Sequence, residues 1–128
     1  MAGIVFFRTT RLAEIADFYT TELGMELWLD QGACKIFAHQ NLLLGFCESL
    51  EAESCGIVTL FYPLTTDVDL MYEKFFDSAD AAPRINARYN IYQFFAKDPE
   101  GRTLEFQTFL HPLKPLNMND IPQSGKWD

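Results

Sequence analysis

The sequence predicts an α+β fold made of two tandem modules, each with one strand, one helix and three further strands. The first observation is an internal repeat, in which Gly3-Ile4-Val5 recurs as Gly56-Ile57-Val58 at an offset of 53 residues. The second is a pair of matching helical faces at an offset of 56. The third is composition: 128 residues, 48% of them hydrophobic, suit one folded domain with its own core.

The first module occupies residues 3–50. Its opening apolar run has the composition of a strand, and a helix follows whose apolar residues recur every three or four positions. The residues of that helical face are Leu12, Ile15, Ala16, Tyr19 and Leu23. Gly24 is a typical C-terminal stop. Three strands are then expected over 25–30, 34–38 and 42–47.

The second module occupies residues 56–110 and repeats this order. Its helical face consists of Val68, Met71, Tyr72, Phe75 and Ala79. Strands are expected over 84–88, 91–97 and 103–109. The last two are joined by Asp98-Pro99-Glu100-Gly101, which suits a type I turn because Asp, Pro and Gly occupy its preferred positions. The two modules form one domain over 1–110, and a proline-marked extended tail is expected over 111–128.

Charge and cysteine usage exclude several classes of protein. The formal net charge is −8 and the basic residues are scattered, so the sequence predicts no nucleic-acid partner. The longest apolar run, 57–64, is too short to cross a bilayer, and no membrane association is expected. The start of the chain lacks a signal peptide, which favours a reducing cytoplasmic location. Because Cys34, Cys47 and Cys55 show no paired spacing, we expect free thiols.

Three sequence features together resemble the vicinal oxygen chelate superfamily, which includes glyoxalase I, bleomycin-resistance proteins, fosfomycin-resistance enzymes and ring-cleaving dioxygenases. They are Phe18-Tyr19, Leu23-Gly24-Met25 and Asp98-Pro99-Glu100-Gly101-Arg102-Thr103-Leu104-Glu105-Phe106. The resemblance covers about residues 3–109. It implies that the two modules form a curled mixed sheet around one cleft. It also implies a homodimer, whose second chain could complete that cleft.

The same resemblance implies a divalent metal held by the first and fourth strands of each module. Matched by the motifs, the four ligand positions fall on Ile4, Gly45, Glu105 and either Ile57 or Thr59. Only Glu105 is a residue type that binds such a metal. We therefore expect no metal site and no cofactor; a divalent metal bound through Glu105 is the alternative.

Several polar and aromatic residues are candidates for a ligand site in the cleft. Alternation along 103–109 places Glu105 and Gln107 on one face. The candidate ligand-binding residues are Arg8, Thr59, Phe61, Gln93, Glu105 and Gln107. Glu105 is also the candidate catalytic residue, as a general base. The alternatives are an ion pair of Glu105 with Arg8, Arg84 or Arg88, an exposed strand-end role for Arg8, and ordinary sheet packing of Thr59 and Phe61.

Three functions remain open at this stage. The first is a protein similar to glyoxalase and bleomycin-resistance proteins that binds a small organic molecule in its cleft without the full metal-ligand set. The second is an enzyme, either a metal-dependent lyase, transferase or dioxygenase of that superfamily, or a metal-independent isomerase that uses Glu105. The third is a non-catalytic interaction module. The first is favoured because the motifs are present while the metal ligands are mostly absent.

Overall fold

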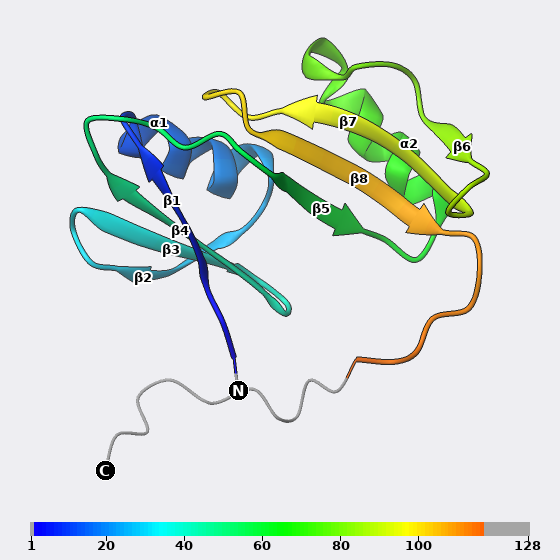
Figure 1. Ribbon diagram of the computed structural model, residues 1–128, viewed down its shortest axis with the longest axis horizontal. Helices are drawn as coiled ribbons and strands as arrows, with labels where there is room; N and C mark the ends of the chain where they lie inside the picture. The colour runs from blue at the N-terminus through cyan, green and yellow to red at the C-terminus, as the bar shows by residue number, and fades with distance from the viewer. Residues whose placement is uncertain (1, 117–128) are drawn as a thin grey trace. The chain divides into compact units, whose positions relative to one another are not determined.

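The computed structural model describes residues 2–116 of the chain. Within this range the protein divides into two compact units, Met1–Ala52 and Glu53–Leu113, and the described residues from 114 onward are grouped with the first. Each unit holds one α-helix and one four-stranded sheet (Figure 1). The predicted α+β class and the predicted modular repeat are confirmed. No helix within the described residues is long and apolar enough to span a bilayer.

The first unit follows the predicted order of elements. These are β1 (Val5–Thr9), α1 (Leu12–Asp17), β2 (Glu26–Asp30), β3 (Cys34–His39) and β4 (Leu42–Glu48). The strands lie in the order β1-β4-β3-β2. β1 runs parallel to β4, and the other pairs are antiparallel, so the sheet is mixed.

The second unit repeats this topology. Its elements are β5 (Ile57–Phe61), α2 (Thr65–Lys74), β6 (Arg84–Asn86), β7 (Ile91–Lys97) and β8 (Thr103–Phe109). The strand order β5-β8-β7-β6 matches that of the first sheet, with β5 parallel to β8. Both sheets therefore place the first strand of a module beside its fourth.

Aromatic packing joins each helix to one face of its sheet. In the first unit, the ring of Tyr19 lies 4.6 Å from that of Phe46 and 6.3 Å from that of Phe37. In the second, Phe75 stacks on Phe106 at 5.1 Å, and Phe106 stacks on Phe94 at 4.9 Å. All six side chains are buried, and burying each contributes about 1.5–3 kcal/mol. The face of each sheet opposite its helix is called the open face below.

The turn between β7 and β8 has the predicted geometry. The Gly101 amide donates to the Asp98 carbonyl at 3.0 Å, and Gly101 has a φ of +86°, which glycine adopts without strain. Asp98 Oδ1 accepts the amides of Glu100 and Arg102. The buried Arg102 guanidinium also donates to the carboxylates of both acidic residues, at 3.1 and 2.9 Å. These hydrogen bonds fix the hairpin whose second strand carries Glu105.

Three elements differ in detail from the prediction. The expected second helix is α-helical only to Lys74, and a 3₁₀ turn follows over Phe76–Ser78, so Ala79 lies beyond it. The expected first helix is α-helical only to Asp17, and a π-helical turn follows over Phe18–Glu22. There the Leu23 amide donates to the Phe18 carbonyl, five residues back. The strand expected over 84–88 ends at Asn86, because its side-chain oxygen accepts the Arg88 amide and closes a local turn.

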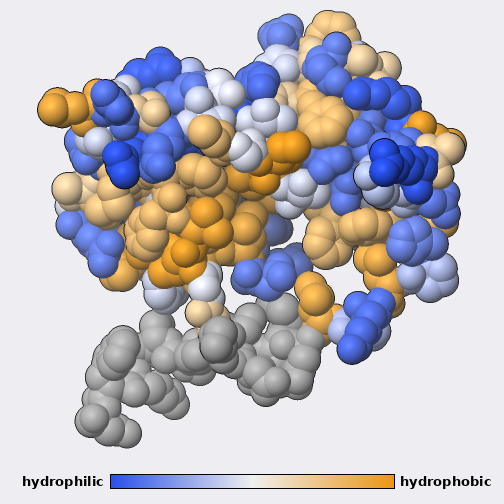
Figure 2. Space-filling view, viewed as in Figure 1, coloured by the Kyte–Doolittle hydropathy of each residue, from blue (hydrophilic) through white to orange (hydrophobic). Residues whose placement is uncertain are grey.

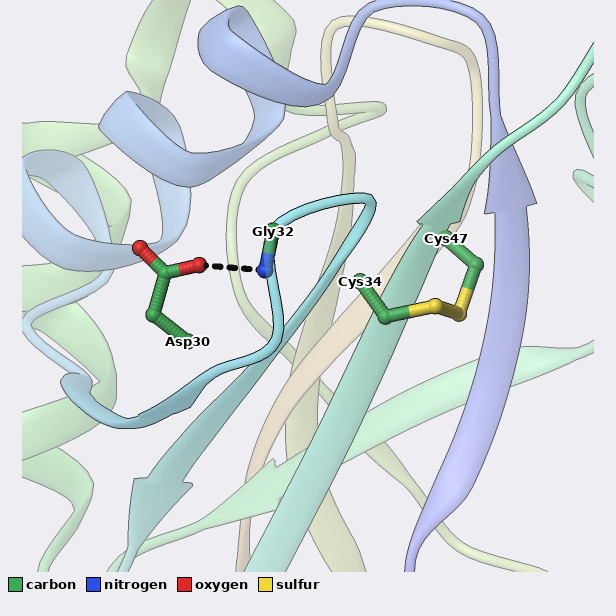
Figure 3. Close-up of a disulfide and its surroundings, with 4 residues drawn as sticks. All are labelled: Asp30, Gly32, Cys34 and Cys47. Atoms are coloured by element: carbon green, nitrogen blue, oxygen red, sulfur yellow. Dashed lines mark hydrogen bonds between the residues drawn. A yellow bond between two sulfur atoms is a disulfide. The ribbon is translucent and has the colours of Figure 1, made fainter.

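The expectation of free thiols is wrong for two of the three cysteines. Cys34 and Cys47 form a disulfide between β3 and β4 (Figure 3), while Cys55 is free and exposed. The spacing of these cysteines along the sequence does not indicate this pairing. The hairpin turn at residues 40–41 brings positions 34 and 47 directly opposite each other in the antiparallel register.

The described part of the predicted tail, residues 111–116, contains neither helix nor strand. Residues 117–128 of that predicted segment lie outside the described residues.

Candidate functional site

Five of the six predicted ligand residues share the open face of the second sheet. Strand register arranges them in two adjacent rows across β5, β8 and β7. One row consists of Thr59, Glu105 and Phe95, and the next of Phe61, Gln107, Gln93 and, on β6, Arg84. The helix packs on the other face through Leu104, Phe106 and their neighbours, as the alternation predicts.

Glu105 is held by Thr59 rather than by an arginine. The Thr59 hydroxyl donates to Glu105 Oε1 at 2.7 Å across the parallel strands β5 and β8. Within residues 2–116 Glu105 forms no ion pair; Arg84 binds Asp80 instead, and the Arg88 guanidinium lies over the Tyr89 ring. The alternatives in which Arg84 or Arg88 neutralises Glu105 are therefore wrong. The alternative with Arg8, which belongs to the first unit, stays a prediction. Glu105 is only partly buried, so its carboxylate is a hydrogen-bond acceptor that a ligand can reach.

Gln93 is the most unusual polar residue of this face. Its side chain is 6% exposed, and its Oε1 atom is buried without a hydrogen-bond partner among the described residues. Gln107, beside it in the same row, is equally buried, but none of its side-chain polar atoms is both buried and unpartnered. The face therefore contains one buried acceptor whose partner does not come from the described protein.

A charged cluster borders the face where β7 extends beyond β6. Arg84 donates to both carboxylate oxygens of Asp80, at 2.8 and 3.4 Å, and its guanidinium lies 5.8 Å from the Phe95 ring centre. Asp80 also accepts the Phe95 amide at 2.9 Å. Partial burial acts to raise the pKa of Asp80, but the hydrogen bonds from Arg84 and the Phe95 amide outweigh it and hold the pKa below its usual value.

Next to this cluster is a shallow depression of about 250 Å³. Its lining residues are Ser78, Asp80, Phe95, Ala96, Lys97 and Thr103. Lys97 Nζ donates to Thr103 Oγ1 at 2.6 Å along one wall. The depression lies within the second unit and shares Phe95 with the row that contains Glu105.

Arg8 belongs to the first unit, whereas the other five candidates belong to the second. It occupies the open face of β1, where its register partner on β4 is Cys47. The same row continues from Cys47 to Cys34 on β3. Figure 2 shows apolar side chains gathered over the strands of this first unit.

Comparison with known proteins was made at the levels of sequence and of structure. No family model and no curated protein matches the sequence. Solved structures do match. A glyoxalase/bleomycin resistance protein/dioxygenase from Nocardioides is 19% identical, with a TM-score of 0.72, over 91% of this chain and 88% of its own. A protein of the same description from Burkholderia phytofirmans has a TM-score of 0.73 at 15% identity, over 84% of this chain and 97% of its own.

The chain has the fold of the vicinal oxygen chelate superfamily. A third match supports this: lactoylglutathione lyase from Agrobacterium tumefaciens, with a TM-score of 0.68 at 14% identity, over 84% of this chain and 92% of its own. At such identities the likeness concerns the fold alone. The vicinal oxygen chelate fold thus confirms the resemblance read from the motifs, while the activity has to be argued from this chain's own residues.

Strand register resolves the metal positions that this fold implies. Thr59, not Ile57, lies beside Glu105, and the corresponding neighbour of Gly45 in the first sheet is Phe6, not Ile4. The Phe6 ring occupies the space into which a side chain at position 45 would project. A phenylalanine, a glycine, a threonine and one carboxylate do not fit a divalent metal centre, which needs about three converging ligands. Within residues 2–116 no three His, Cys, Asp or Glu residues cluster as a metal site.

Sequence reasoning missed part of this site. Alternation through Gln93 already placed Phe95 and Lys97 on the same face, and this signal was available. Asp80 gave no such signal, because it lies in a loop and reaches the face through its hydrogen bond with the Phe95 backbone.

Proposed function

We propose that the chain is a small-molecule binding protein that uses the open face of the second sheet without a divalent metal. The ligand class is an aromatic amine or amidine, which combines a planar apolar ring with N–H donors. The observation that carries the proposal is the buried, unpartnered Oε1 atom of Gln93.

A buried acceptor without a partner is costly to the free protein. Leaving a carbonyl group desolvated and unpaired costs about 1–3 kcal/mol. A ligand N–H that donates to Gln93 Oε1 would remove this penalty. This hydrogen bond adds to the binding free energy that burial of the ligand ring supplies. It also favours ligands with an N–H donor at this position over ligands with an acceptor there.

The surroundings of Gln93 support the same ligand class. Glu105, in the adjacent row, offers a second acceptor that carries negative charge. Phe61, 48% exposed, and the partly buried Phe95 provide aromatic surface on the same face. The net charge of −8 also attracts cations to the protein at long range. A flat cation with several N–H groups suits all three features.

A thermal-shift comparison of charge-matched probes tests the proposal. Benzamidine and tryptamine at millimolar concentration are expected to raise the melting temperature, because a ligand at 100 times its Kd stabilises by about 2.7 kcal/mol. Benzoate and indole-3-acetate have similar rings but carry a carboxylate, and no shift is expected from them. Equal shifts with both pairs, or none with either, would contradict the proposal.

Two variants locate the site. Gln93→Met is expected to stabilise the free protein by about 1–2 kcal/mol, because it removes the unpaired acceptor at similar volume, and to weaken the response to benzamidine. Glu105→Gln is expected to weaken it as well. The matched control is Glu73→Gln, which removes an exposed carboxylate from α2 and should leave the response unchanged.

A further inference from the structure

The open face of the first sheet carries a different chemical group at the positions that bear glutamines in the second. Cys47 and Cys34 lie opposite each other on β4 and β3, as Gln107 and Gln93 do on β8 and β7. Arg8 is the register neighbour of Cys47 on β1. The parallel pairing of β1 with β4 sends both side chains to the same face, so Arg8 and the disulfide share one row.

The disulfide is not required to hold its hairpin together. β3 and β4 are already joined by six register pairs from Cys34–Cys47 to His39–Leu42. The equivalent hairpin of the second unit, β7 with β8, has the same topology and contains no cysteine. That second sheet forms without a covalent cross-link. By the same backbone hydrogen bonding, we expect the first sheet to stay folded when its disulfide is reduced.

The disulfide is also accessible. Cys34 and Cys47 are both partly exposed, and they lie on the face opposite Tyr19 and the helix (Figure 3). Cys34 follows a tight turn in which Gly32 has a φ of +83° and donates its amide to Asp30 Oδ1. That short turn brings no bulky side chain directly beside Cys34 in the sequence, because Gly32 and Ala33 precede it.

We propose that Cys34 and Cys47 form a reversible thiol–disulfide exchange site whose co-reactant is a dithiol. A thiolate of the dithiol attacks Cys34 Sγ, the Sγ–Sγ bond breaks, and its electron pair remains on Cys47 as a thiolate beside Arg8. The second thiol of the reductant then attacks the mixed disulfide and releases Cys34. The protein disulfide gains two electrons and two protons, and the dithiol becomes a disulfide.

Arg8 determines which of the two sulfur atoms the incoming thiolate attacks. A nearby cation stabilises a thiolate, and the sulfur that leaves more readily is the one with the stabilised thiolate. On this open face the described charged neighbour of the pair is Arg8 on β1, beside Cys47; Lys35 on β3 projects to the opposite face, where it binds Asp30 on β2. Cys47 is therefore the leaving thiol and Cys34 the attacked one.

The test uses the full chain in a Cys55→Ser background, so that only the paired cysteines react. The oxidised protein is treated with dithiothreitol in native buffer, quenched with iodoacetamide and analysed by mass spectrometry, while far-UV circular dichroism follows the fold. Both cysteines are expected to become alkylated with the native spectrum retained and at a rate that low urea does not change. Reduction only under unfolding conditions, or loss of the native spectrum on reduction, would overturn the proposal.

Two further measurements test the roles of the individual residues. Reaction of the same oxidised protein with glutathione, followed by peptide mapping, is expected to place the mixed disulfide on Cys34; a mixed disulfide on Cys47 would contradict the assignment. Arg8→Gln is expected to slow reduction roughly threefold or more, because it removes the charge beside the leaving thiolate. Arg11→Gln, the matched control, removes an exposed arginine that pairs with Glu14 and should leave the rate unchanged. Equal rates for the two variants would overturn the role of Arg8.

Discussion

The two sheets share one topology but differ in what they present on their open faces. One pair of equivalent rows reads Arg8, Cys47 and Cys34 in the first sheet and Phe61, Gln107 and Gln93 in the second. The adjacent rows read Phe6, Gly45 and Ile36 in the first and Thr59, Glu105 and Phe95 in the second. The backbone positions correspond one to one, so the difference lies in side-chain chemistry alone.

This difference places an apolar row in one sheet and a polar row at the equivalent positions of the other. In the first sheet the row of Phe6, Gly45 and Ile36 offers a ligand no polar side chain, because the Phe6 ring covers Gly45 and Ile36 is buried. In the second sheet Glu105 supplies an acceptor in place of Gly45, and Gln93, in the adjacent row, supplies a buried acceptor without a partner among the described residues in place of Cys34. Because unpaired buried groups are costly, the polar face is the one that a ligand would stabilise most.

Two ion pairs of the second unit, one buried and one exposed, give the largest expected contrast. Arg102→Leu is predicted to destabilise the protein by about 3–5 kcal/mol, because it leaves the buried Asp98 carboxylate without its ion-pair partner. Urea unfolding at neutral pH measures this change. The control is Arg84→Leu, whose ion pair with Asp80 is exposed and whose loss should cost less than about 1 kcal/mol. Similar costs for the two variants would show that burial does not distinguish these ion pairs.

A smaller effect is expected at the apolar contact of the first sheet. Gly45→Ala places a methyl group against the Phe6 ring and should cost about 1–3 kcal/mol. In a Phe6→Ala background the same substitution should cost less than about 0.5 kcal/mol, because the ring that it displaces is gone. A double-mutant cycle by urea unfolding measures the coupling. Additive costs would mean that the Phe6 ring does not restrict position 45.

The smallest effect concerns pH. The lowered pKa of Asp80 means that this carboxylate contributes stability above its unfolded value of 3.8 and loses it as the pH falls through the folded pKa. Because Asp80 is exposed, Asp80→Asn should cost less than about 1 kcal/mol at pH 7. The difference between wild type and variant should shrink below pH 3.8. A difference that grows with falling pH would contradict this.

The fold could be predicted from sequence because its signals are local and repeated. Each of these signals depends on residues close together in the sequence: the periodic helix faces, the turn at Asp98 and the alternation along β8. The order of helix and strands also occurs in both modules, which strengthens the prediction. The face of Glu105 followed from the same alternation. The hydrogen-bond partner of Glu105 did not follow from alternation. The loop after β5 differs in length from its counterpart in the first module, so Ile57 and Thr59 were both possible until the register of β5 against β8 was known.

What the sequence could not supply depends on contacts between distant residues. The disulfide requires the register of the β3–β4 hairpin, which spacing alone does not give. The burial of Gln93 depends on neighbouring strands, and the approach of Asp80 depends on the path of a loop. The predicted homodimer and the shared cleft remain predictions.

Ligand binding on the open face of the second sheet is tested most directly by mapping where a probe binds. Two-dimensional amide spectra of labelled protein, recorded with increasing tryptamine, report on both open faces at once. If tryptamine binds the second sheet, the shifts concentrate on the Gln93 side-chain amide and on the backbone of Thr59, Glu105 and Gln107, while Phe6, Gly45 and Ile36 stay unchanged. Shifts centred on the first sheet, or none at saturating tryptamine, would contradict it.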